Sequence, residues 1–349
     1  MVSERRFLVR RSRSSASSTA RRGARGGYAA LILVSLTLLL SGCSVQGAEK
    51  HLRFGWPTGV TRQAERMRVL WSWSGVAALV LGVIVWGLIF WCCIRYRKRN
   101  DELPRQTKYN FVVEMVCVIV PFLVIIGLFW RTVVVEDDVD HLSKDPDVLV
   151  TVDAFKWNWQ FEYDHYKTTP TTGTDIAAVY PGVKNPATGG VLNLNTVGSD
   201  NEIPVLVIPV GETVQIIEHS EDVVHSFWVP EFLFKRDVIP YGTQAEQHAS
   251  GLADNRFEFT ATSTGSFVGR CAELCGTYHS QMNFEVRVVS QNDFVTYLKA
   301  LAAIPYTDPA RQSKALSQVF GVDQAYATTT YPFNTDRAAR KASTKASGS

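Results

Sequence analysis

Two thiols, one imidazole and one thioether occur within a short segment near the end of the chain, contributed by Cys271, Cys275, His279 and Met282. Soft sulfur together with imidazole suits copper, zinc or iron–sulfur, whereas hard cations prefer oxygen. The methionine favours copper, because copper electron-transfer sites use a thioether as a weak axial ligand and zinc has little use for one. The segment therefore predicts a copper site.

Two further observations bear on this site. His225 stands in the string Asp-Val-Val-His-Ser after a predicted strand, and in a β-sandwich it could meet the distant loop and complete the ligand set. A disulfide between Cys271 and Cys275 is the alternative interpretation in an oxidising compartment. That bond would leave His279 and Met282 without a role.

The elements that must position these donors are short strands. Runs of β-branched and aromatic residues, separated by Pro, Gly, Asn and Asp, predict an all-β domain over 132–295, as a sandwich or Greek-key barrel. The runs are 148–152, 205–209, 213–218, 256–262 and 283–289. Residues 166–200 are predicted to form an inserted loop. Over 296–349 we expect the end of a short helix, 293–303, and then a disordered tail.

Two apolar segments precede this domain. Residues 69–94 carry no charge and residues 109–131 carry only Glu114 before Arg131, so each is long enough to cross a bilayer. The loop between them, 95–108, is rich in Lys and Arg and is predicted to be cytoplasmic. The two spans form a hairpin that places everything after about residue 132 outside.

The beginning of the chain has the order of a signal peptide. Residues 1–27 hold eight Arg against one Glu, and an uncharged apolar stretch leads to Leu-Ser-Gly-Cys, ending at Cys43. The last four residues resemble the lipobox of bacterial lipoproteins. We expect 1–42 to be a lipoprotein-type signal peptide, Cys43 to be lipidated, and 43–68 to be extracytoplasmic, although an ordinary secretory signal is the alternative.

Charge narrows the choice of partners. The whole chain has 349 residues and a formal charge of +3, but residues 136–330 hold 12 Lys and Arg against 26 Asp and Glu, a net charge of −14. A segment this acidic argues against nucleic acid and favours a basic partner.

The string C-x-E-x-C-G-x-x-H-x-x-M, the preceding D-V-x-H-S and the two spans resemble subunit II of the haem–copper cytochrome c oxidases, of the actinobacterial type. The resemblance implies a membrane-anchored cupredoxin domain with the dinuclear copper centre CuA. Its ligands would be His225, Cys271, Glu273 through the backbone carbonyl, Cys275, His279 and Met282. Two coppers would be bridged by both thiolates, and the Glu273 side chain would reach a magnesium ion shared with subunit I.

The same resemblance assigns further roles. Trp157, in an aromatic strand, would be where the electron from cytochrome c enters, and Asp222 and Asp237 are candidates for docking that donor. Glu114 would stand at the cytoplasmic mouth of a proton channel, with snorkelling to the interface as the alternative. Subunit I would reduce oxygen to water, coupled to proton pumping. In the actinobacterial type the donor can be a membrane-bound cytochrome c of a cytochrome bc complex.

Three related classes fit less well. Quinol-oxidase subunits II lack the copper ligands that are complete here. Thioredoxin-like copper chaperones usually have Pro after the second Cys and a distant His, whereas Gly276 and His279 follow here. Nitrous oxide reductases share the ligand loop but have no two-span hairpin. The chain also departs from the expected family pattern at Lys156, in a longer interval between His225 and Cys271, and in the 166–200 segment.

Overall fold

A computed structural model describes residues 56–101, 103, 106–166, 194–199, 202–240 and 255–328. The expected signal peptide 1–42, Cys43, most of the 166–200 insertion and the last residues of the tail lie outside the described residues.

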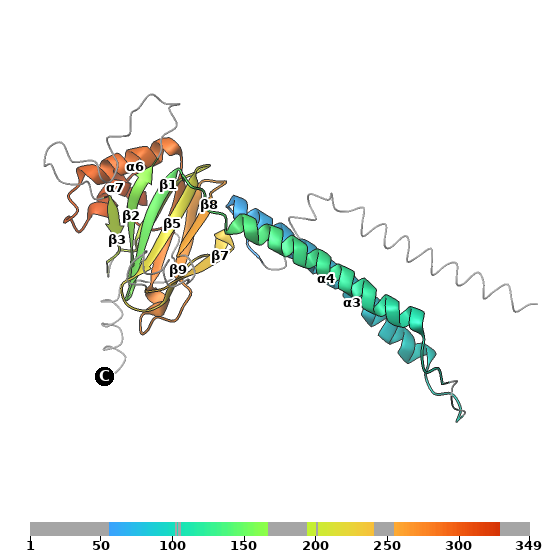
Figure 1. Cartoon of the computed structure of the whole chain (residues 1–349). Coiled ribbons are helices and arrows are strands. Elements are labelled where there is room, and N and C mark those ends of the chain that lie inside the picture. Colours follow the sequence, from blue (N-terminus) through green and yellow to red (C-terminus); the bar gives the residue numbers. More distant parts are fainter. Residues whose placement is uncertain are drawn as a thin grey trace, which may run out of the picture. The chain divides into compact units, whose positions relative to one another are not determined.

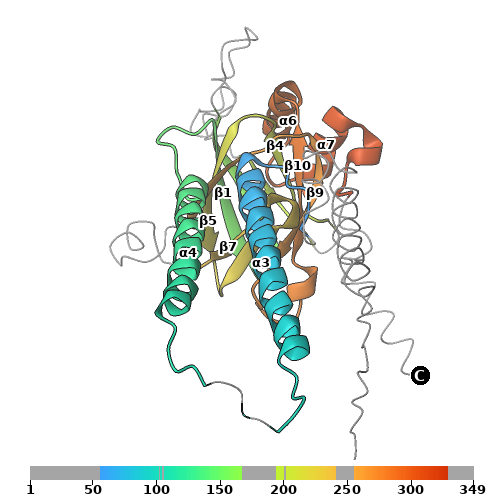
Figure 2. The same ribbon diagram turned by 90° about the vertical axis from the view of Figure 1, so that its right-hand side faces the viewer.

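Two long helices form the predicted hairpin and run side by side (Figures 1 and 2). Helix α3 spans Arg62–Arg95 and α4 spans Phe111–Val139, and both are long and apolar enough to cross a membrane. The side chain of Thr61 accepts from the N–H of Ala64 and caps the start of α3.

Both helices extend beyond the predicted spans. Helix α3 begins before residue 69 and α4 continues past residue 131, because charged residues can continue a helix once it has left the apolar region. The two extensions are joined by an ion pair, in which Arg66 Nε lies 3.1 Å from Asp138 Oδ2.

The expected β-domain consists of two five-stranded sheets packed on a common core. The first has the order β3-β2-β1-β5-β8, and the second has the order β4-β10-β9-β6-β7. The strands of the first sheet are β1 Val148–Phe155, β2 Asn158–Tyr166, β3 Asn195–Val197, β5 Thr213–Ser220 and β8 Arg256–Thr260. Those of the second are β4 Val205–Pro209, β6 His225–Val229, β7 Phe234–Val238, β9 Gly265–Cys271 and β10 Asn283–Val289.

Alternating side chains explain why these strands form a sandwich. Burial alternates along β1, with Val148, Val150 and Val152 fully buried and the residues between them partly exposed. Aromatic rings join the two sheets: Trp159 of β2 lies 5.2 Å from Phe284 of β10, measured between ring centroids. Two of the strand pairs, β1 with β5 and β4 with β10, are parallel, so the chain must cross over between the paired strands.

The prediction of a disordered tail directly after the first helix is wrong for residues 304–328. Helix α6, Gln291–Ala303, is followed by α7, Arg311–Phe320, and by a short 3-10 helix, Val322–Gln324. The guanidinium of Arg311 donates to the carbonyls of Leu301 and Asn195, which fixes α7 to the sandwich. The fully buried side chain of Leu316 adds apolar contact, so this segment packs onto the common core of the sandwich.

Candidate metal centre

The ligand loop connects two neighbouring strands of the second sheet. Cys271 is the last residue of β9, and β10 begins at Asn283, directly after Met282. The backbone N–H of Cys271 donates to the carbonyl of Met282 over 3.0 Å and closes the base of the loop. Within the loop, Gly276 has φ of 123°, a conformation that favours glycine, and a short 3-10 helix begins at His279.

The four donors predicted from the loop come together. Cys271 Sγ lies 3.9 Å from Cys275 Sγ, which in turn lies 3.6 Å from His279 Nδ1 and 3.7 Å from Met282 Sδ. Both cysteines and Met282 are buried, and Met282 is only 1% exposed. The loop therefore presents three sulfurs and one imidazole nitrogen to a single small volume.

The fifth donor arrives from a distant part of the sequence, as predicted. His225 is the first residue of β6, and the pairing of β6 with β9 places Phe227 opposite Cys271. His225 is completely buried, with Nδ1 3.9 Å from Cys271 Sγ. The sheet register thus completes the set of sulfur and nitrogen donors.

Asp222 fixes the orientation of the His225 ring. Its Oδ1 lies 2.9 Å from His225 Nε2, and its Oδ2 accepts from the backbone N–H of Lys156. Burial alone would raise the pKa of Asp222, but the hydrogen bonds from Lys156, His225 and Val223 outweigh it and lower that pKa. An ionised carboxylate at Nε2 favours the tautomer with a proton there and leaves Nδ1 free to bind a metal.

The two thiols share their protons unequally. The pKa of Cys271 is lowered, chiefly by its contact with the Cys275 thiol, with further contributions from His225 and from the backbone of Ser226 and Glu273. The pKa of Cys275 is raised, first by the same interaction and then by burial. The lowered pKa of Cys271 favours its thiolate, which is the form that ligates metals.

The structure does not contain the alternative disulfide. Cys271 and Cys275 are both free thiols, and their sulfurs lie 3.9 Å apart, whereas a disulfide bond is about 2 Å long. Two thiols, two imidazoles and a thioether match soft or borderline metals, and the thioether favours copper. The donor set therefore fits copper.

Comparisons with known proteins identify the family of this chain. A family model described as "Cytochrome C oxidase subunit II, periplasmic domain" matches residues 148–289, from the start of β1 to the end of β10. The chain is 42% identical over 342 residues to the "Probable cytochrome c oxidase subunit 2" of Nocardia farcinica, covering 87% of each. It is 41% identical over 345 residues to cytochrome c oxidase subunit 2 of Mycobacterium tuberculosis, covering 90% of this chain and 91% of that relative. The chain belongs to the cytochrome c oxidase subunit 2 family.

Membership of the subunit 2 family confirms the predicted fold class, two apolar helices followed by a β-sandwich that resembles the cupredoxin fold. The chain is a membrane-anchored component of an oxidase complex, in which further oxidase subunits are expected. Among solved structures, the periplasmic domain of subunit II of cytochrome oxidase from Bradyrhizobium japonicum matches with 24% identity and a TM-score of 0.32, covering 45% of this chain and 95% of that chain.

Glu273 has two separate parts in the subunit 2 site. Its backbone carbonyl lies 3.2 Å from Cys271 Sγ and so faces the metal centre. The residue as a whole is exposed. Trp159 of β2 also contacts the centre. Its indole N–H donates to the carbonyl of Met282, and its ring lies 6.2 Å from that of His225. No residue pattern distinguishes this contact from ordinary core packing.

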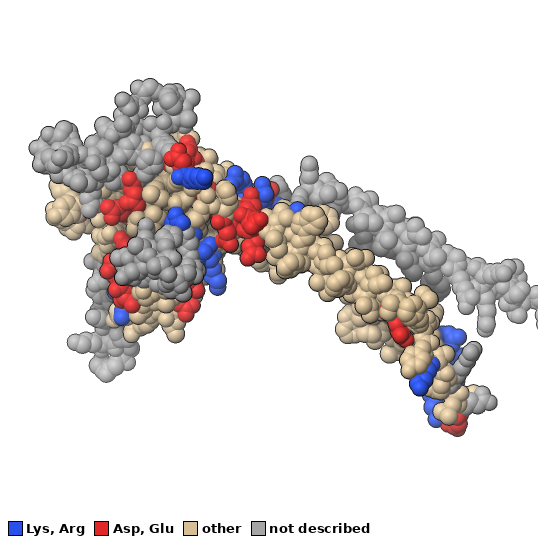
Figure 3. Space-filling view, in the orientation of Figure 1, with Lys and Arg blue, Asp and Glu red and all other residues tan. Residues whose placement is uncertain are grey.

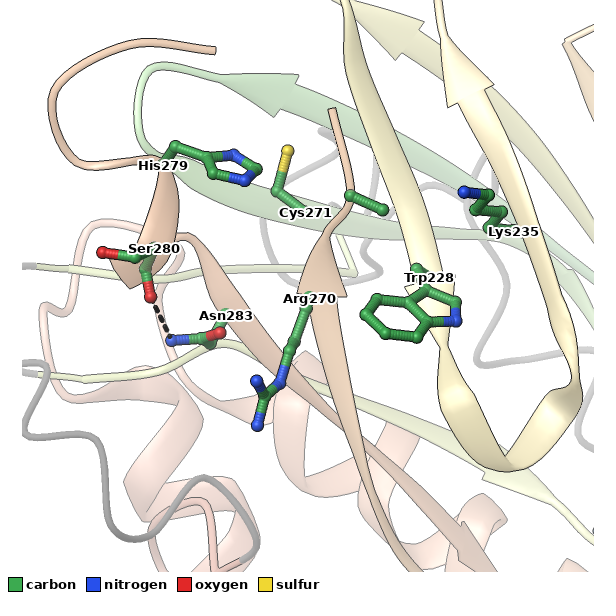
Figure 4. A pocket seen from close by; sticks show the side chains of 8 residues that line it. Trp228, Lys235, Arg270, Cys271, His279, Ser280 and Asn283 are labelled. Carbon is green, nitrogen blue, oxygen red and sulfur yellow. Dashed lines mark hydrogen bonds between the residues drawn. The ribbon is translucent and has the colours of Figure 1, made fainter. Parts of the chain in front are cut away.

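A cavity of about 440 Å³ opens against one side of the metal centre. Figure 4 shows His279 and Cys271 at one side of it and Trp228, Arg270 and Lys235 around the rest. The two cationic side chains give this cavity a positive rim.

Trp157 lies at the turn between β1 and β2, against the ligand loop. Its indole Nε1 donates to the carbonyl of Cys275 over 3.2 Å. Its ring meets Tyr278 edge to face at 4.9 Å between centroids, and a Cβ on Gly276 would lie 3.2 Å from the indole. The predicted residue is therefore in direct contact with the loop that carries four of the five side-chain donors.

The remaining predicted residues lie apart from the metal donors. Asp237 is an exposed residue of β7, opposite Ser226. Glu114 is in the first turn of α4, where its Oε1 accepts from the backbone N–H of Asn110 over 3.2 Å, while the Asn110 side chain accepts from Val113. This reciprocal capping gives Glu114 a structural role as well.

Proposed function

We propose that this chain is the electron-accepting subunit of the oxidase, and that His225, Cys271, the Glu273 carbonyl, Cys275, His279 and Met282 hold two copper ions. The observation that carries the proposal is the convergence of these donors from the β9–β10 loop and the start of β6. Bound copper supplies one-electron chemistry. The partners of this electron transfer are also proposed: cytochrome c would donate the electrons, and a haem in subunit I would accept them.

The residues around the centre hold it in one geometry. The loop closure at Cys271 and Met282 fixes the two ends of the ligand segment, and Asp222 fixes the His225 ring. Because the Cys, Met and His225 side chains are buried in the sandwich core, they change position little when charge changes. A rigid, preorganised site needs little rearrangement for each electron that passes.

Trp157 is proposed as the residue through which the electron enters. It is partly exposed, so a docked protein can reach it, and its indole N–H contacts the backbone of a copper ligand. Asp237, together with the partly exposed carboxylate of Asp222, is proposed to attract a basic cytochrome c, either soluble or membrane-bound as part of a cytochrome bc complex.

Several further assignments follow from family membership and stay proposals. Glu273 would contribute a carboxylate to a magnesium ion shared with subunit I. Glu114 would pass protons from the cytoplasm toward subunit I, where oxygen is reduced to water with proton pumping. The metal-binding domain would be extracytoplasmic in a bacterial cell membrane, with Cys43 lipidated after removal of 1–42.

The copper assignment is tested on the full chain in its oxidase. Copper content and the visible spectrum are measured for Cys271→Ser and for the matched control Cys117→Ser, whose thiol lies exposed in α4. The expected result is loss of copper and of the mixed-valence bands in Cys271→Ser alone. Unchanged copper content and spectrum in Cys271→Ser would overturn the assignment.

A further inference from the structure

A second group of side chains that could hold a metal ion lies on the outer face of the first sheet. Asp153 of β1 and His219 of β5 are directly opposite in the parallel register, so their side chains are neighbours on one face. Glu221 follows His219 by two residues, and its backbone N–H donates to the Ala154 carbonyl, which continues the pairing beyond β5. The strand alternation thus puts His219 and Glu221 on the same face.

The three donor atoms have the spacing of ligands around one ion. His219 Nδ1 lies 3.3 Å from Asp153 Oδ1 and 3.6 Å from Glu221 Oε1, and all three atoms lie within 4.8 Å of one another. Nitrogen and oxygen ligands bound tetrahedrally to zinc at about 2 Å are about 3.3 Å apart. Small side-chain rotations would bring all three donors to one ion.

Gln160 determines which oxygen of Asp153 faces the histidine. Its Nε2 donates to Asp153 Oδ2 over 3.2 Å, and Oδ1 is left toward His219. A neighbour that orients a ligating carboxylate is a regular feature of metal sites. The His219 and Glu221 side chains are 37% and 61% exposed, so an ion and its water ligands can reach the group from solvent.

The charge around the group is unbalanced. Burial is the main cause that raises the pKa of Asp153. The charge of His219 opposes this shift, and the negative charge of Glu221 adds to it. Asp153 in turn contributes to the raised pKa values of Glu162 and Asp164 on β2, for which burial is the first cause. Within the part of the chain that the structure describes, no Lys or Arg forms an ion pair with Asp153, Glu162 or Asp164. A divalent cation would relieve this repulsion.

We propose that Asp153, His219 and Glu221 bind a borderline divalent cation of the zinc class, with water completing its coordination. An imidazole together with carboxylates suits zinc and similar ions, whereas calcium and magnesium prefer oxygen ligands alone. This site shares no ligand with the candidate copper centre, so the proposal does not depend on the function proposed above.

The test uses the purified oxidase with its copper centre filled and adventitious ions removed by a chelator. Zn²⁺ alone is titrated calorimetrically, and Co²⁺ is titrated in parallel as an optical probe. We expect one Zn²⁺ per chain above the background of His219→Gln, together with tetrahedral Co²⁺ bands that lack sulfur-to-cobalt charge transfer. The absence of that charge transfer shows that cobalt has not entered the site of Cys271 and Cys275.

Variants on the same face decide the assignment. His219→Gln is expected to weaken Zn²⁺ binding by about 100-fold and Glu221→Gln by about tenfold, on the scale of lost ligands. The matched control is His141→Gln, an exposed histidine outside the group, which should bind Zn²⁺ as the parent does. Unchanged melting curves and copper spectra confirm that the variants fold. Equal Zn²⁺ binding in the parent and His219→Gln would overturn the proposal.

Discussion

Met282 contributes the most adjustable donor of the metal centre. Its sulfur lies 3.7 Å from Cys275 Sγ, whereas the two thiols and the two imidazoles supply the stronger ligands. We predict that Met282→Leu keeps copper bound but changes the redox potential and the visible spectrum, because a weak axial ligand tunes the site without holding it. The change in side-chain volume is small, so the substitution should lower the free energy of unfolding by less than about 1.5 kcal/mol. Copper loss in Met282→Leu, measured by elemental analysis, would contradict this role.

Trp157 can be separated from the metal ligands by its hydrogen bond. The change Trp157→Phe keeps an aromatic ring beside Tyr278 but removes the N–H that donates to the Cys275 carbonyl. We predict that reduction by cytochrome c slows by about tenfold, the effect of roughly 1.4 kcal/mol on a barrier. Reduction by a small chemical reductant and the copper spectrum should stay unchanged. Equal slowing with both reductants would indicate a damaged centre instead of an altered point of electron transfer.

At the scale of residues, the chemistry of the ligands could be predicted and their surroundings could not. Cys271, Cys275, His279 and Met282 are close in sequence, so their types and spacing indicate a shared site. Asp222 was expected only as a docking residue, yet it also orients His225. That contact depends on how the segment before β6 folds back toward Lys156, which spacing alone does not specify.

Strand β5 carries a buried carboxyl group on its core face. Glu218 lies on the same face of the strand as Val214 and Ile216, which are fully buried. Neither of its carboxyl oxygens has a hydrogen-bond partner among the described residues. Burial raises the pKa of Glu218 well above its ordinary value, with the charge of Arg236 opposing this shift. Its contribution to stability is therefore fully present below the unfolded pKa of about 4.5 and is lost as pH rises through the folded pKa.

We predict that Glu218→Gln removes this pH dependence. An amide resembles the protonated acid but cannot ionise, so the variant should melt close to the parent at pH 5 and higher than the parent at pH 8. The difference grows by about 1.4 kcal/mol per pH unit until the folded pKa is reached, and about 1 kcal/mol moves Tm by roughly 2–4 °C in a domain of this size. Calorimetric melting at both pH values checks this prediction. A Tm difference between parent and variant that is the same at pH 5 and pH 8 would contradict it.

A substitution in helix α4 can separate the proposed proton transfer by Glu114 from its role as a helix cap. Glu114→Gln can still accept from the Asn110 N–H, so the helix start should be preserved, but an amide cannot take up and release a proton. We predict lower steady-state turnover of the assembled oxidase, with the copper spectrum and the first electron transfer unchanged. Unchanged turnover would leave Glu114 as a cap that reaches the membrane interface.

At the scale of elements, strong periodic patterns predicted structure well. The uncharged spans and the β-branched runs that became β1, β4, β5, β8 and β10 were found from their composition. Helix α7 was missed because its Ser and Ala content resembles a disordered tail. Its order depends on contacts remote in sequence, such as Arg311 with Asn195 and Gln312 with Val205. The outer ends of α3 and α4 were missed because hydropathy marks the apolar stretch and not the helix.

Over the whole molecule, charge is separated by segment. Figure 3 shows the hairpin as a long surface of uncharged residues, with charged groups near its ends and over the β-domain. The apolar side chains of α3 and α4 are exposed in the isolated chain, as expected for helices that face lipid. This separation of charge can be predicted from the sequence alone, because it depends only on how charged residues are distributed along the chain.

The acidic character of residues 136–330 should govern how fast a soluble donor arrives. With 26 Asp and Glu against 12 Lys and Arg, this segment would attract the proposed basic cytochrome c, and salt at physiological concentration would shorten that attraction to about 8 Å. We predict that the second-order rate of reduction falls by about tenfold between 10 and 150 mM salt, measured by stopped flow. Asp237→Asn should reduce both the low-salt rate and its salt dependence, because Asp237 is exposed on β7, whereas the control Asp323→Asn, exposed in the short 3-10 helix near the C-terminal end of the described chain, should change neither. A rate that is insensitive to salt would mean that the donor is already held in the complex, where attraction from a distance no longer limits transfer.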